Sequence, residues 1–77
     1  MVIDKAYFDR EAGLFWDMMG LRTYTVEQVS DALRGLVTVY LNMCINPAVS
    51  AKDKEAAQQF MDTTCEEHDR RLALRLV

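Results

Sequence analysis

The chain has 77 residues and a formal net charge of −3, with an isoelectric point near 4.9. This acidic balance argues against a protein that binds DNA or RNA through the phosphates, because such binding depends on clustered Lys and Arg. The N-terminal segment lacks the basic region and apolar run of a signal peptide, and no uncharged stretch approaches the roughly 20 residues that span a bilayer. We therefore expect a cytoplasmic protein without a membrane partner.

The hydrophobic fraction of the chain is 51%, which is high for so short a sequence. A small domain has much surface for its volume and buries a smaller share of that surface than a large one. We expect a single domain, residues 1–77, that covers its surplus apolar surface by association. The two cysteines, Cys44 and Cys65, fit reduced cytosolic thiols better than a disulfide framework.

The first predicted helix runs from Asp4 to Met19. Asp4 is a favourable N-cap residue, and Lys5 and Asp9 have the four-residue spacing of a helical ion pair. Gly20 is placed to stop the helix as a C′ residue. The expected core stripe consists of Ile3, Tyr7, Leu14, Met18 and Leu21, widened by Phe8, Phe15 and Met19.

Gly13 and the aromatic run that follows it are the unusual features of this helix. A glycine costs about 1 kcal/mol relative to Ala in a helix interior, so we expect Gly13 to admit a neighbouring backbone or to mark a kink. The run from Leu14 to Met19 has the aromatic and Met composition of interface anchors, and its alternative interpretation is ordinary core. The candidate contacts with a partner in this run are Phe15, Trp16 and Met19.

The second predicted helix, residues 26–45, opens with a capping box. The Thr25 hydroxyl is expected to accept from the backbone N–H of Gln28, and the Gln28 side chain from the backbone N–H of Thr25. Tyr24 and Val29 stand at the positions of a hydrophobic staple. Polar residues at helical spacing then predict a narrow solvent-facing stripe of Glu27, Asp31, Arg34, Thr38 and Asn42.

From Gly35 to Ile45 the sequence carries no charge and is apolar nearly all round. A helix of this kind is central in its fold, and the two flanking helices leave part of it uncovered. We expect a second copy of the chain to cover that part, since two-fold dimers are the commonest oligomers. The same run alternates like a strand and is rich in β-branched residues, so an intermolecular sheet over 36–45 is the competing interpretation. The expected dimer contacts are Leu36, Val37, Tyr40, Leu41 and Cys44.

The third predicted helix, residues 51–75, follows Asn46 and Pro47, which end the second helix. Ser50, with Asp53 three residues later, is an N-cap signature. The face expected to pack inward consists of Ala56, Ala57, Phe60, Met61, Thr64, Cys65, His68 and Leu72.

Charged residues gather near the C-terminal end of this third helix. Glu66 with Arg70, and Glu67 with Arg71, have the spacing of helical ion pairs. The cluster of Arg70, Arg71 and Arg75 is interpreted as complementing the negative end of a helix dipole, with an acidic partner or phosphate as the alternative. We expect the apolar residues of the final LALRLV to dock on another surface or to fray.

Catalysis and metal binding have little support in the sequence. Cys65 and His68 share a helix face at i and i+3, but zinc needs a third and usually a fourth ligand, and the chain has no second His. We interpret His68 as half-buried between helices. A Cys65 nucleophile inside a helix would lack an oxyanion hole, and the three glycines are too far apart for a phosphate-binding loop. We expect no enzyme, no metal and no cofactor.

The segment from Tyr24 to Leu33, YTVEQVSDAL, resembles the opening helix of helix-turn-helix transcription factors. The resemblance implies a DNA-binding regulator with the C-terminal arginines on phosphate. A recognition helix should follow a short turn, however, whereas the apolar run after Arg34 has no groove-reading side chains. The favoured prediction is an all-α domain of three helices, completed as a homodimer, that binds and inhibits, sequesters or adapts another protein. The alternative is the DNA-binding regulator.

Overall fold

The computed structural model describes residues 3–21 and 24–76, and the side chains of residues 74–76 lie outside that description. Within these residues the chain forms three α-helices and no strand: α1 (Lys5–Gly20), α2 (Val26–Cys44) and α3 (Ala51–Leu76). Each bound lies within one residue of the predicted one. The all-α fold class is confirmed, and the strand interpretation of 36–45 is wrong, because this segment forms the second half of α2 and its cap.

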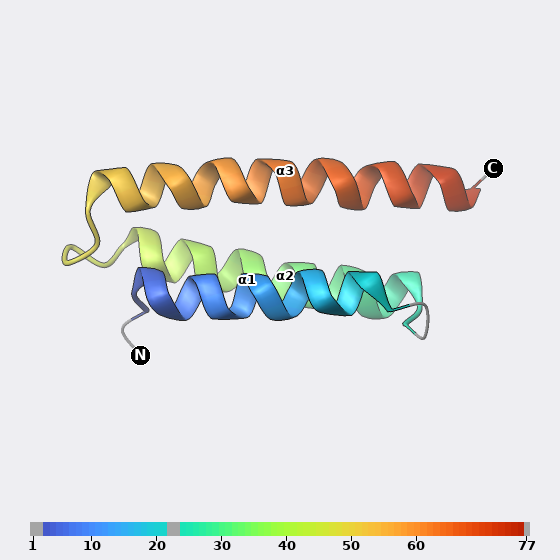
Figure 1. The fold of residues 1–77 in the computed structure, drawn as a ribbon, viewed down its shortest axis with the longest axis horizontal. Coiled ribbons are helices and arrows are strands. Elements are labelled where there is room, and N and C mark those ends of the chain that lie inside the picture. The colour runs from blue at the N-terminus through green and yellow to red at the C-terminus, as the bar shows by residue number, and fades with distance from the viewer. Residues whose placement is uncertain (1–2, 22–23, 77) are drawn as a thin grey trace.

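α1 and α2 run antiparallel as a hairpin, and α3 lies lengthwise against both, as Figure 1 shows. α3 has 26 residues, and a rise of about 1.5 Å per residue makes it the element that sets the long dimension of the molecule. The described chain measures 43 × 19 × 15 Å. The C-terminal part of α3 extends past the turn between α1 and α2 (Figure 1).

Side chains cap the first turn of all three helices, as predicted. The Asp4 carboxylate accepts a 2.8 Å hydrogen bond from the backbone N–H of Tyr7 at the start of α1. The Ser50 hydroxyl accepts a 3.1 Å bond from the N–H of Asp53 at the start of α3. Both bonds of the capping box at the start of α2 are also present. These bonds satisfy backbone donors that have no partner inside the helix.

The end of α1 differs from the prediction. Gly20 is the last helical residue and has no positive φ, so it is not the C′ stop that was expected. The backbone N–H of Leu21 donates to the carbonyl of Met18 at 3.1 Å, and Arg71 of α3 donates from Nη1 to the carbonyl of Met19 at 2.8 Å. An arginine of the predicted cluster therefore does complement a helix C-terminus, but that of α1.

The buried core forms where the three helices meet. α1 is apolar over more than one face, and the positions of α2 and α3 select the part that is buried. The predicted α1 stripe is partly wrong, because Leu14 and Leu21 are 57% and 56% exposed. α1 buries Phe8, Phe15 and Met19, which were predicted to widen the stripe, together with Ala12, which was not predicted. The remaining buried apolar residues of the described chain are Ile3, Leu36, Met43, Val49, Ala57 and Met61.

Aromatic rings join the helices inside this core. The ring of Phe8 in α1 lies 6.0 Å from that of Tyr40 in α2 and 5.9 Å from that of Phe60 in α3, measured between centroids. Trp16, two turns further along α1, meets the same Phe60 edge-on at 6.3 Å. Tilted and edge-on arrangements are the favourable ones for aromatic pairs. Phe60 thus holds α1 at two points.

α2 shows the polar stripe that was predicted. Its exposed residues include Glu27, Asp31, Arg34 and Thr38, and Asn42 is partly exposed. The opposite side of α2 buries Leu36 and Met43 in the core. Two apolar residues near the end of the helix remain largely exposed, namely Leu41 at 56% and Ile45 at 78%.

Asn46 does more than end α2, which the sequence did not indicate. Its side chain is buried, donates from Nδ2 to the carbonyl of Ile3 at 3.1 Å, and accepts from the N–H of Ala48 at 3.0 Å. One amide therefore joins the segment before α1 to the connection between α2 and α3. A buried amide is retained when both its donor and its acceptor find partners, as here.

The predicted inward face of α3 is largely confirmed. Ala56 is the exception, because it is exposed. The fully or nearly buried members are Ala57, Met61 and Thr64, and the partly buried ones are Phe60, Cys65, His68 and Leu72. The side chains of the last predicted docking residues, 74–77, and of Arg75 lie outside the described residues.

The ion pairs of α3 converge on one carboxylate. Glu67 accepts from Arg71 Nε at 2.7 Å, as predicted, and from Arg70 Nε and Nη2 at 3.0 and 2.7 Å. The predicted Glu66–Arg70 pair is wrong, because Arg70 turns to the carboxylate three residues before it. Hydrogen bonds from the two guanidinium groups lower the pKa of Glu67 to about 2.

Gly13 does not admit a neighbouring backbone. The residue is exposed, and a Cβ built on it would meet nothing within 4 Å. The expectation of a close helix approach at Gly13 is therefore wrong. No packing of the described chain requires a glycine there.

Candidate functional site

An apolar depression lies between α1 and α2 and has a volume of about 390 Å³. No side chain of α3 that the structure describes lines it, so this part of α3 leaves that side of the hairpin open. We call this depression the hairpin groove. Its lining residues are Glu11, Leu14, Phe15, Met18, Ala32, Gly35, Leu36 and Val39.

The hairpin groove combines a protruding side chain with a recess. Leu14 on its α1 wall is 57% exposed. Gly35 on its α2 wall is exposed, and a Cβ at that position would meet nothing within 4 Å. Ala32, one turn before Gly35, is the other small residue of this wall. The space beside Gly35 is therefore not filled by the described residues of the chain.

Of the eight residues predicted to contact a partner, three contribute mainly to the core of their own chain. These are Phe15, Met19 and Leu36, which are 4%, 8% and 4% exposed. Phe15 and Leu36 also form part of the groove lining. The half-buried residues of the set are Trp16, Val37, Tyr40 and Cys44. The one that remains largely exposed is Leu41.

Leu41 lies on a different side of α2 from the hairpin groove. It is two residues from Val39, which lines the groove, and successive helical residues are rotated by about 100°. Leu41 therefore projects from nearly the opposite side of α2. Ile45, one turn further, is exposed beside it. The hairpin groove and the Leu41–Ile45 pair are therefore separate apolar surfaces.

His68 lies between α2 and α3, as predicted for a half-buried interface histidine. Its Nε2 is 3.1 Å from the Ser30 hydroxyl of α2, and its Nδ1 is 3.5 Å from the carboxylate of Asp69. Both ring nitrogens thus face protein oxygen atoms. Within the described residues, no group of three or more His, Cys, Asp or Glu side chains is placed to hold a metal ion.

The thiol of Cys65 is poorly suited to nucleophilic chemistry. Burial raises its pKa, and the nearby carboxylates of Asp69 and Asp62 raise it further. The thiolate, which is the reactive form, is therefore disfavoured. On α2, a hydrogen bond with Cys44 and burial raise the pKa of the Tyr40 phenol, so this hydroxyl also keeps its proton.

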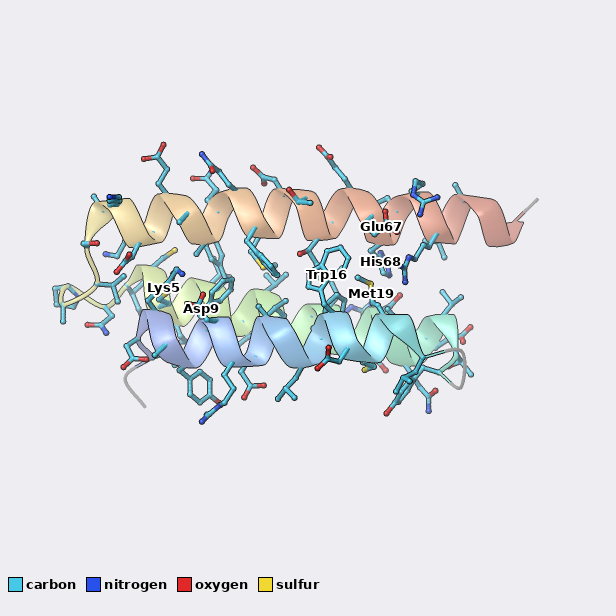
Figure 2. The ribbon with its side chains drawn as sticks, viewed as in Figure 1. Lys5, Asp9, Trp16, Met19, Glu67 and His68 are labelled. Atoms are coloured by element: carbon cyan, nitrogen blue, oxygen red, sulfur yellow. The ribbon has the colours of Figure 1, made fainter. Side chains whose placement is uncertain are left out.

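A second depression lies between the C-terminal end of α1, the start of α2 and the C-terminal half of α3. It has a volume of about 340 Å³, and we call it the end hollow. Figure 2 shows Met19 and His68 between α1 and α3 at this end, next to Glu67. The predicted staple residues Tyr24 and Val29 both belong to its lining. The other lining residues are Met19, Leu21, Val26, His68, Arg71 and Leu72.

None of the described helices is long and apolar enough to cross a membrane. Comparison of this chain with protein-family models, with curated proteins and with solved structures finds no match. The function of the chain has to be inferred from its own surfaces, which are the hairpin groove, the Leu41–Ile45 pair and the end hollow.

Proposed function

We propose that this chain is a small, non-enzymatic protein–protein interaction module that pairs with a second copy of itself and binds another protein. The observation that carries this proposal is the hairpin groove, an uncovered apolar surface on the side of the hairpin that α3 does not line. Surfaces of this kind on small soluble domains mark sites of association. The high hydrophobic fraction of the chain, 51%, agrees with this assignment.

The hairpin groove contains both a protruding leucine and open space at a glycine, which favours a second copy as its occupant. A two-fold interface brings residue i against residue j and also j against i. Leu14 and Gly35 line the same groove, so an axis through the groove places Leu14 of each copy over Gly35 of the other. The protruding side chain then enters the recess on both sides at once.

Burial of Leu14 alone does not supply enough free energy for pairing, so the two copies must bury the apolar residues along the whole groove. Burying a Leu side chain contributes about 1.5–3 kcal/mol. Association costs about 4–15 kcal/mol in lost translational and rotational freedom. Two leucines contribute about 3–6 kcal/mol, which falls short over most of that range. Met18 and Val39, which flank Leu14 and Gly35 in the groove, supply further apolar area from each copy.

The second apolar surface is assigned to the other protein. Leu41 and Ile45 are exposed on a side of α2 that the proposed pairing leaves free. A dimer presents this pair twice, which strengthens binding to a partner with two matching sites. Leu41 is thus retained as a predicted interaction residue, with the partner protein as its contact.

Three variants test the pairing by static light scattering at micromolar concentration. The wild type is expected to run with the mass of two chains, each of 8.9 kDa. Leu14→Glu places a charge in the interface and should give a folded monomer. Gly35→Leu should also give a monomer, because its side chain fills the recess, yet nothing within 4 Å of its Cβ opposes it in the single chain. The matched control Leu41→Glu alters an equally exposed leucine and should remain dimeric.

A wild-type chain that runs as a folded monomer under these conditions would reject the proposed pairing. A dimer that survives Leu14→Glu but dissociates with Leu41→Glu would move the interface to the other side of α2.

Titration with generic duplex DNA at low ionic strength tests the DNA-binding alternative, since the proposed module should show no salt-dependent binding. Arg70 and Arg71 already pair with Glu67, which agrees with that expectation.

A further inference from the structure

We propose that the end hollow binds a small organic monocarboxylate with an apolar body. This site lies at the α1–α2 connection and involves no residue of the hairpin groove. The proposal is therefore independent of pairing between copies. It rests on the shape of the hollow, the composition of its lining and the charge on one side of it.

The lining of the end hollow suits an apolar body. Its volume of about 340 Å³ is at the lower end of the range of ligand sites, which favours a small molecule. Six of its eight lining residues are apolar or aromatic: Met19, Leu21, Tyr24, Val26, Val29 and Leu72. His68 completes this surface with its ring, since its two nitrogens already face Ser30 and Asp69.

The polar end of the ligand is assigned to Arg71, whose guanidinium is held in place by the protein. Its Nε donates to Glu67 at 2.7 Å and its Nη1 to the carbonyl of Met19 at 2.8 Å. Within the described part of the chain these bonds leave Nη2 without a protein acceptor. A guanidinium fixed in this way loses little freedom when it binds a carboxylate, which is its preferred anion.

The charges around Arg71 favour an anion over a neutral molecule. The carboxylate of Glu67 pairs with two guanidinium groups, those of Arg70 and Arg71. The three side chains together therefore carry a net charge of one positive unit. Asp69 is the other nearby carboxylate, and it is largely exposed beside His68. Among the described residues, the lining of the hollow includes Arg71 but no Asp or Glu.

The test compares octanoate with 1-octanol, which share an apolar chain and differ in charge. Binding is followed by NMR titration of the methyl groups of Met19, Val26, Val29 and Leu72, and affinity by calorimetry. Octanoate is expected to bind about tenfold more tightly than octanol, the usual contribution of one charge-assisted hydrogen bond. The methyl shifts should be confined to the end hollow.

Two arginine variants give a matched comparison. Arg71→Gln should reduce octanoate affinity to that of octanol, whereas Arg70→Gln should leave the tenfold preference, because Arg70 pairs with Glu67 but does not line the hollow. If Arg71→Gln does not fold, Val29→Phe fills the hollow while leaving the arginine, and octanoate binding should be lost. Leu14→Glu, in the hairpin groove, should bind octanoate like the wild type.

The proposal is overturned by equal affinities for octanoate and octanol, by no saturable binding of either, or by octanoate binding that survives Arg71→Gln or Val29→Phe. Shifts that map to Leu14, Met18 and Val39 instead would also reject it, by placing the ligand in the hairpin groove.

Discussion

The indole Nε1 of Trp16 in α1 donates a 3.0 Å hydrogen bond to the hydroxyl of Thr64 in α3, across 48 residues of sequence. Thr64 is fully buried and donates its own proton to the carbonyl of Phe60 at 2.8 Å. The one tryptophan of the chain is therefore fixed between two helices (Figure 2). Trp16 thus makes two contacts with α3, this hydrogen bond to Thr64 and the edge-on ring contact with Phe60.

Replacing Thr64 by Val should destabilise the protein by about 1–3 kcal/mol, because the Trp16 N–H loses its acceptor while partly buried. The measurement is urea unfolding followed by Trp16 fluorescence. Thr63→Val is the matched control, since Thr63 makes the same bond to the carbonyl four residues back but is exposed. We expect its effect to stay within about 0.5 kcal/mol. Equal losses for the two variants would contradict the role given to the indole bond.

The capping box at the start of α2 predicts a cost of about 1 kcal/mol for Thr25→Ala. Thr25 accepts from the N–H of Gln28 at 3.1 Å, and Gln28 accepts from the N–H of Thr25 at 2.8 Å. The unfolding free energy from urea titration checks this value. Thr38→Ala, in the exposed middle of α2, removes a threonine without removing a cap and should not destabilise the protein, because Ala favours a helix interior over Thr. A neutral Thr25→Ala would mean that the box contributes nothing.

Gly13→Ala should stabilise the folded chain by about 0.5–1 kcal/mol, because the helix interior favours Ala and the new Cβ meets nothing within 4 Å. The reverse change at an exposed position of the same helix, Ala6→Gly, should cost a similar amount. Thermal unfolding followed by circular dichroism measures both. Loss of stability in Gly13→Ala would indicate a neighbour at this position, such as a bound partner.

The lowered pKa of Glu67 predicts that the free energy of unfolding decreases in acid. Its pKa in the folded chain is about 2, below the ordinary value of 4.5, because two arginines hydrogen-bond its carboxylate. A group with a lowered pKa stabilises the fold above its unfolded pKa, and this contribution disappears as the pH falls through the folded pKa. The stability difference between the wild type and Glu67→Gln should therefore be constant above about pH 5 and shrink towards pH 2.

Urea titrations at a series of pH values measure that difference. The control is Glu66→Gln, because Glu66 is exposed and forms no ion pair with the described residues. Its effect should depend little on pH. A difference for Glu67→Gln that stays constant down to pH 2 would show that the paired carboxylate is not the source of the acid sensitivity.

Local sequence signals set where the three helices begin and where α2 ends. Asp4, Thr25 and Ser50 act on backbone groups within three residues, and the Asn46–Pro47 step ends α2 through local sterics. All the atoms that make these capping bonds lie within one helical turn of each other. The bonds therefore form in the same way whatever the helices pack against.

Which apolar surfaces are buried depends on how the three helices pack together. α1 is apolar over a wide arc, and its rotation against α2 and α3 buries Phe15 while exposing Leu14. The same rotation brings Leu14 and Gly35 to one groove. Helical periodicity gives the faces of each helix separately, but the angle between two helices depends on how their side chains interlock. The bonds from Arg71 to Met19 and from Trp16 to Thr64 join residues about 50 positions apart, so no local pattern could have indicated them.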